Sequence, residues 1–206
     1  MALVKYNNIS LSAITSTGLS TGAMTLIKSQ TASSSATISF VDGTSDVVLD
    51  NTYPIYLFKF YNIHPETNFR HFSFQANAAG GSGYNETITS TMFVADHNEG
   101  DSTTTLSYET DGDLAQGTGV QSILHGVGNG NDESASGELW LFNLSSTTYV
   151  KHFISSGHIH TDDDKSRQAY AGGYINTTSA IDEIQFSFSS GDIDSGTIKL
   201  YGIKDS

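Results

Sequence analysis

The sequence predicts an all-β protein, a sandwich or barrel of short antiparallel strands. Segments of alternating apolar and polar residues recur at short spacing, and Gly, Asp, Asn and Ser separate them. Both prolines, Pro54 and Pro65, flank a strand segment and do not interrupt one. The 206 residues are enough for one domain with a substantial core.

The chain divides into an arm and a domain. Residues 1–24 are small and polar and show no sustained apolar face, which predicts an extended N-terminal arm that orders against a partner. Residues 25–206 are expected to form a single β-sandwich domain. Its strands are expected, in order, at 25–30, 35–41, 55–63, 69–75, 86–96, 103–109, 137–144, 147–156, 167–176, 182–190 and 195–203.

Individual segments carry further expectations. The segment 55–63 is apolar on most of both faces, which is typical of a strand packed between two sheets. The segment 112–126 could hold a short helix, and Gly172 and Gly173 suggest a bulge or a bend. The closing strand should complete the sandwich by lying antiparallel to 182–190.

The aromatic run has a second interpretation, a sugar-stacking platform. It would be made of exposed rings instead of core rings. The residues concerned are Tyr53, Tyr56, Phe58, Phe60 and Tyr61.

Charge and composition exclude several classes of partner and site. Nine basic residues against 22 acidic ones give a net charge of −13, which argues against nucleic acid and against anionic membrane surfaces. The absence of cysteine excludes disulfides, zinc–thiolate sites and thiol nucleophiles. No stretch is long enough to span a membrane, and the start does not resemble a secretory signal.

One histidine cluster has metal-ligand character. His158 and His160 would share one face of a strand, and His152 on a neighbouring strand could supply a third ligand. The competing interpretation is a strand that ends in an acidic, solvated turn at Asp162–Asp164, and it is preferred because the third ligand is undefined. Gly128–Ser134 offers oxygen ligands but lacks the spacing of a calcium-binding loop.

Catalytic motifs are absent from the sequence. There is no G-x-S-x-G elbow, P-loop or dinucleotide fingerprint, and no pair of carboxylates is singled out. The chain is therefore expected not to be an enzyme, with no catalytic residue, no cofactor and no metal beyond the three histidine candidates.

Several stretches together resemble a family of virion structural proteins of tailed phages, common in marine and cyanobacterial phages. The resemblance covers residues 25 to 203. Its most specific part is the ending "FSFSSGDIDSGTIKLYGI", with "YINTTSAI" before it. The segment "NIHPETN" separates this branch of the family from other phage proteins that share only the ending. The family implies a jelly-roll-like sandwich without assigned catalysis, located in the virion after assembly in the bacterial cytoplasm.

Three functions follow from the sequence and the resemblance. The first is a structural building block, a capsid decoration or fibre and appendage protein, most plausibly a homotrimer, whose N-terminal arm docks on capsid or tail proteins. The second is a receptor-binding tip that recognises host surface glycan, suggested by the aromatic residues and by expected polar loops at 111–136 and 158–168. The third, ranked last, is a polysaccharide-degrading enzyme.

Overall fold

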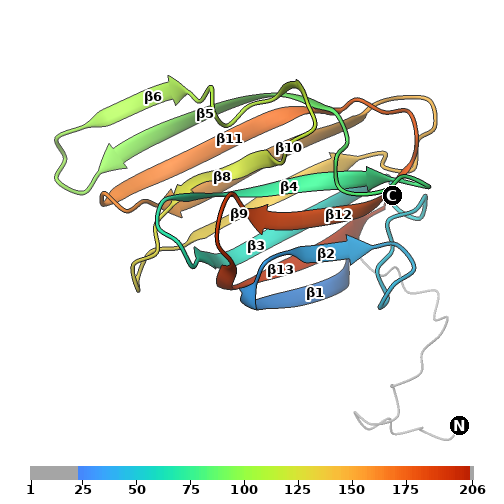
Figure 1. The fold of residues 1–206 in the computed structure, drawn as a ribbon, viewed down its shortest axis with the longest axis horizontal. Coiled ribbons are helices and arrows are strands. Elements are labelled where there is room, and N and C mark those ends of the chain that lie inside the picture. Colours follow the sequence, from blue (N-terminus) through green and yellow to red (C-terminus); the bar gives the residue numbers. More distant parts are fainter. Residues whose placement is uncertain (1–22, 205–206) are drawn as a thin grey trace, which may run out of the picture.

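A computed structural model describes residues 23–204, which form two antiparallel β-sheets packed face to face (Figure 1). The larger sheet has nine strands, in the order β1-β13-β3-β9-β10-β11-β5-β6 with β7 also paired to β5, and the smaller has the order β2-β12-β4-β8. The strands are β1 (Met24–Ser35), β2 (Ile38–Val41), β3 (Ile55–Pro65), β4 (Arg70–Ala78), β5 (Ile88–Asn98), β6 (Thr104–Tyr108), β7 (Ala115–Gly117), β8 (Gln121–Val127), β9 (Ala135–Phe142), β10 (Lys151–His160), β11 (Lys165–Ile175), β12 (Ile181–Phe188) and β13 (Ile193–Ile203).

The expected all-β sandwich is confirmed. Of the expected arm, residues 1–22 lie outside the described residues, and β1 begins at Met24. Within 23–204 the structure contains no helix that could cross a membrane.

Eight strands pair in a nested order, the first with the last. β1 pairs with β13, β2 with β12, β3 with β9, and β4 with β8. The first and third pairs join in the larger sheet, because β13 also pairs with β3. The second and fourth pairs join in the smaller sheet, because β12 also pairs with β4. The remaining strands, β5 to β7, β10 and β11, all extend the larger sheet.

The core between the sheets is organised around Phe186 on β12. Its ring lies 5.0–6.2 Å, centroid to centroid, from the rings of Phe40, Phe58, Phe60 and Phe72. Phe58 and Phe60 belong to the larger sheet and the other rings to the smaller one, so this cluster holds the two layers together. Because Phe58, Phe60 and Tyr56 are buried, the core interpretation of the 55–63 run is supported over the sugar platform for those three rings.

Glycine lets β8 approach the larger sheet closely. Gly157 on β10 faces Leu124 on β8, and a Cβ at Gly157 would overlap the Leu124 side chain. Every residue of β8 is buried. A side chain at position 157 would hold the two sheets apart.

The closing strand was placed wrongly by the sequence. β13 does not lie beside β12; the two strands belong to opposite sheets, and β13 pairs with β1 and β3. The prediction that Ile198 and Leu200 face the core is confirmed, since both are fully buried. The short connection between β12 and β13 crosses from one sheet to the other and does not close a hairpin. The alternation of apolar and polar residues is the same in both cases, so it cannot distinguish a crossover from a hairpin.

Three local expectations were also wrong. The segment 112–126 contains β7 and β8 and no helix, because β8 is buried between β4 and the larger sheet. The expected polar loop at 111–136 therefore contains the buried strand β8. The expected polar loop at 158–168 is reduced to a tight turn between the end of β10 and the start of β11. Gly172 and Gly173 cause no bulge: β11 keeps one register with both neighbours, which fix it along its length.

Replacing the central ring tests this account of the core. We expect Phe186→Ala to lower the free energy of unfolding by about 3–5 kcal/mol, because it leaves a cavity between the sheets. Phe93→Ala is the matched control, since Phe93 is exposed and should cost less than about 1 kcal/mol. Urea unfolding followed by circular dichroism measures both values. Equal losses for the two variants would contradict the role of Phe186.

Candidate functional site

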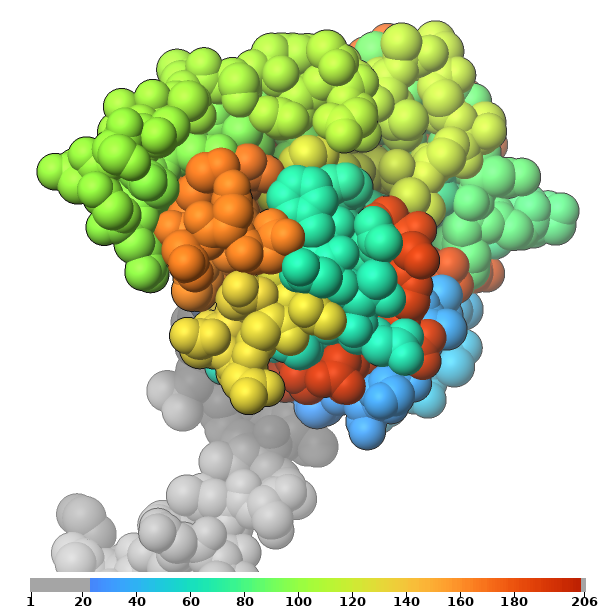
Figure 2. All heavy atoms as spheres, turned by 60° about the vertical axis from the view of Figure 1, so that its left-hand side comes forward, coloured from blue at the N-terminus to red at the C-terminus, as the bar shows by residue number. Residues whose placement is uncertain are grey.

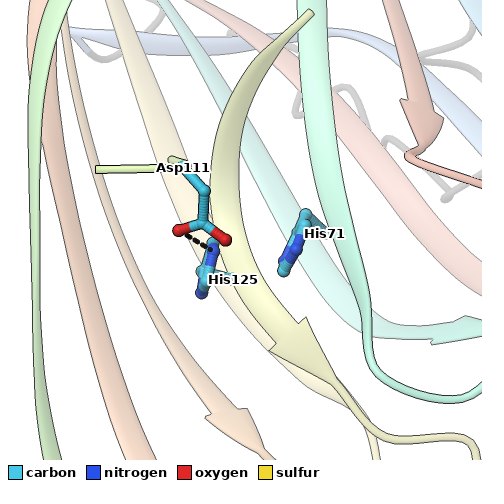
Figure 3. Close-up of side chains that lie close together, drawn as sticks. All are labelled: His71, Asp111 and His125. Atoms are coloured by element: carbon cyan, nitrogen blue, oxygen red, sulfur yellow. Dashed lines mark ion pairs between the residues drawn. The ribbon is translucent and has the colours of Figure 1, made fainter. Parts of the chain in front are cut away.

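A cluster of titratable side chains lies between β4 and β8. His71 comes from the start of β4, His125 from β8, and Asp111 from the segment after β6 (Figure 3). The imidazole rings of His71 and His125 stack, with centroids 3.8 Å apart and planes 12° from parallel. Gly126 has φ +82°, a left-handed conformation that glycine adopts readily, and its backbone N–H donates to His71 Nδ1 at 3.0 Å.

Burial keeps both imidazoles uncharged at neutral pH. Burial, together with the neighbouring His125, lowers the pKa of His71 from 6.5 to about 4. Burial also lowers the pKa of His125, against the opposing effect of Asp111. His125 Nε2 lies 3.4 Å from Asp111 Oδ1, the contact drawn in Figure 3, but the geometry is not that of a hydrogen bond, and both His125 ring nitrogens are buried without a partner.

The residues meet some requirements of a metal site and fail others. The candidate ligand atoms lie within 4.8 Å of one another, and uncharged imidazoles are the form that binds metal. However, His71 Nδ1 accepts a hydrogen from Gly126, so the uncharged ring carries its proton on Nε2 and has no free lone pair there. Parallel stacked rings also direct their lone pairs alongside one another instead of toward one point. The arrangement fits a packed, uncharged pair better than a metal centre.

The neighbouring ion pair fixes this region to the larger sheet. Arg167 on β11 binds Asp96 on β5 through Nε at 2.8 Å and Nη2 at 2.7 Å, and its Nη1 donates to the carbonyl of His125 at 3.3 Å. The hydrogen bonds to Asp96 raise the pKa of Arg167. Arg167 thereby links β5 and β11 of the larger sheet to β8 of the smaller one, so the histidine pair lies where the two sheets meet.

The three histidines named from the sequence are not brought together. His152, His158 and His160 all lie on β10, so the placement of His152 on a neighbouring strand was wrong. At about 3.3 Å per residue, His152 is roughly 20 Å from His158, too far to share an ion. His158 Nε2 is 2.8 Å from Ser166 Oγ, and His160 is 3.8 Å from Glu99. The strand does end in an acidic turn, as the preferred interpretation held.

The cluster that the structure does assemble was missed by the sequence reading. His71, Asp111 and His125 are far apart in the chain and show no ligand spacing. His71 lies in the expected strand 69–75, and His125 lies in the segment 112–126, for which the sequence allows a short helix. Neither pattern predicts that the two residues meet. Only the pairing of β4 with β8 brings the rings into contact.

A groove of about 360 Å³ lies over the larger sheet, on the side away from the core. Lys59, Glu138, Ser156 and His158 line it, and Lys59 pairs with Glu138 at 3.4 Å. Tyr61 forms one wall and is 40% exposed. An exposed ring beside several hydrogen-bonding groups is an arrangement that can contact a sugar.

Loops from distant parts of the chain meet at one end of the sandwich, the end that faces forward in Figure 2. Asn68 donates to Asp162 at 3.0 Å, and Asn129 donates to the carbonyl of Glu66 at 3.0 Å. The segments 65–69, 128–134 and 161–164 are therefore bound to one another. These hydrogen bonds explain the polar residues of the turns without a bound ion.

An acid titration tests the state of the histidine pair. The folded pKa of His71 is about 4 and the unfolded value 6.5, so the unfolded chain binds more protons between these pH values, and stability falls as the pH falls through them. From pH 7.5 to 5.0 we expect His71 to contribute about 1 kcal/mol of this loss, after allowance for its partial exposure.

His71→Asn keeps an acceptor for Gly126 but cannot be protonated, so the loss should shrink in this variant. His158→Asn, on the exposed face of β10, is the control and should keep the full loss. Urea midpoints at the two pH values measure both effects. Identical pH dependence in His71→Asn and wild type would show that His71 is not a buried, uncharged ring.

The comparisons with known proteins identify no relative. No protein-family model matches the chain, no curated protein matches it, and no solved structure matches it. The family resemblance therefore rests on the sequence stretches quoted above.

Proposed function

We propose that this chain is a non-enzymatic structural subunit of a bacteriophage particle, a capsid decoration or a fibre and appendage protein that assembles with copies of itself. The observation that carries the proposal is the nested pairing of eight strands into two sheets of alternating pairs. We infer a jelly-roll-like arrangement from this order, and jelly rolls are common in viral capsid proteins and lectins. A shared fold hosts many functions, and the surface of the protein is what distinguishes them.

The surface of the larger sheet gives that support. Its outer face has no covering layer within residues 23–204, although it carries exposed apolar side chains on several strands. Exposed patches of this kind mark contact surfaces for other proteins. The segment expected to act as an arm joins the domain at Met24, at the edge of this same sheet, which suits docking onto a neighbouring virion protein or subunit.

Removing the arm tests the structural role. We expect a chain lacking residues 1–22 to keep the melting temperature of the full chain, because the described sheets begin after these residues. The same chain should be lost from purified phage particles, as measured by quantitative mass spectrometry of particles grown with each version. Absence of the full-length protein from particles would contradict a virion role, and unchanged incorporation of the shortened chain would contradict the arm.

The groove supports a second candidate function, a receptor-binding tip that recognises host surface glycan. Tyr61 offers an exposed ring, and Glu138, Ser156 and His158 offer hydrogen bonds around it. Aromatic stacking combined with such bonds is a common mode of sugar recognition.

A glycan array compares the two functions directly. If the tip function holds, Tyr61→Ala should weaken binding to the recognised glycan at least tenfold, because it removes the ring that the sugar would contact. Tyr149→Ala is the matched control: Tyr149 is 73% exposed but lies outside this groove, so binding should be unchanged. No binding of the wild-type chain to any host glycan would exclude the tip function and leave the structural one.

A further inference from the structure

The two outer strands of the larger sheet are both open. β6 ends one side of the strand order and β1 ends the other, and each has a partner on one side only among the described residues (Figure 1). An open edge exposes unpaired backbone groups, and proteins usually protect it with charged residues or proline. β6 has neither: its residues are Thr104, Thr105, Leu106, Ser107 and Tyr108, and all are exposed. Figure 2 shows the green segment around residue 100 projecting from the body of the molecule.

Apolar side chains reach this edge on the outer face of the sheet. Leu106 is 74% exposed. Tyr108 lies opposite Phe93 on β5, which lies opposite Tyr170 on β11, and the rings of Phe93 and Tyr170 stack 5.1 Å apart. Directly opposed residues share a face, so a row of exposed rings leads from the middle of the sheet to β6.

The other edge carries matching apolar residues. Met24 and Leu26 on β1 are each 51% exposed. Leu26 pairs with Tyr201 on β13, and Tyr201 pairs with Leu57 on β3. Leu57 and Phe58 are consecutive strand residues and point to opposite faces, and Phe58 faces the core, so Leu57 lies on the outer face. Leu26 lies on the same face as Leu57, because directly opposed residues share a face. Both edges therefore present apolar side chains on the same side of the sheet.

The charges at the two edges differ in sign. Residues 71–150 contain no Lys or Arg, and the carboxylates Glu99, Asp101, Glu109, Asp111 and Asp113 flank β6. β1 contains Lys28 and no carboxylate, β13 beside it contains Lys199 and Asp194, and Lys204 and Asp205 follow β13 in the sequence. A pair of β6 strands would bring like charges together, whereas β6 against β1 brings unlike charges together.

The strand directions also suit a β6–β1 contact. The path from β1 to β6 contains eight strands, and each neighbour is antiparallel to the last, so β6 runs opposite to β1. A second copy placed beside the first in the same orientation would therefore offer its β1 antiparallel to β6. The two edges of one copy are about 34 Å apart across seven interstrand gaps, so they cannot pair with each other.

We propose that β6 of one copy pairs with β1 of the next copy and joins the two larger sheets edge to edge. The contact is head-to-tail, so repetition gives a closed ring or an open filament. It combines backbone hydrogen bonds, apolar contact between Leu106 and the Met24–Leu26 side chains, and attraction between the acidic and basic edges. This inference rests on the self-assembly included in the proposed function.

Variants at the two edges test the pairing. Leu106→Lys places a cation on β6, facing the basic edge, and Leu26→Glu places a carboxylate on β1, facing the acidic edge. Both residues are exposed, so the folded domain should keep its melting temperature. By light scattering after size exclusion, wild type should be oligomeric and each variant monomeric. Ile154→Lys is the control: Ile154 is 55% exposed in the middle of the outer face, so this variant should stay oligomeric.

Mixing distinguishes head-to-tail pairing from the alternatives. Leu106→Lys retains a native β1 and Leu26→Glu a native β6, and the two substituted edges carry opposite charges, so an equal mixture should regain the association that each variant alone has lost. Oligomers that persist in both variants would overturn the edge pairing and leave self-assembly intact. Loss in Leu106→Lys alone would instead indicate a symmetric β6–β6 contact and overturn it too. A wild-type chain that stays monomeric would contradict self-assembly itself, and the pairing with it.

Discussion

The packing of Phe186 between the two sheets is the contact on which the rest of this structure depends. Its ring touches rings from both layers, and no disulfide is available to hold the layers together, because the chain has no cysteine. The separation of the sheets is therefore set by noncovalent contacts, with side-chain packing as the main one and the Arg167 hydrogen bond to the His125 carbonyl beside it. That separation in turn determines which other contacts can form, including the approach of Leu124 to Gly157.

The unequal size of the sheets follows from where the extra strands attach. The nested strands supply four members to each sheet, whereas β5 to β7, β10 and β11 all join the larger one. The smaller sheet cannot cover so wide a neighbour. The chain therefore uses the segment after β6 to cover part of β5, with Glu109 bonded to Met92 and Leu114 bonded to Ser90. The outer face and the two edges stay open, and they carry the surfaces on which the functional proposals rest.

The histidine pair shows how a site-like cluster can arise from packing. Two imidazoles stack because β4 and β8 are neighbours, and their burial makes the uncharged form the stable one. Groups with strongly shifted pKa values often mark functional sites, but structural clusters shift pKa values by the same physical causes. Here the hydrogen bond from Gly126 to His71 fixes the ring in a state that does not offer a metal ligand. The exposed groove and the sheet edges therefore give better support for a function than this cluster does.

Residue patterning along the chain predicts the class of the fold and most of its strands. Period-two alternation placed Phe58 and Phe60 on the face that proved buried, and Ile198 and Leu200 likewise, because alternation records which side of a strand meets the core. It could not decide which strands are neighbours. The pairing of β13 with β1 and β3, the burial of β8 and the meeting of His71 with His125 depend on contacts between distant residues. These features appear only in the folded chain, since a strand pattern specifies which face is buried and leaves the partner strand open.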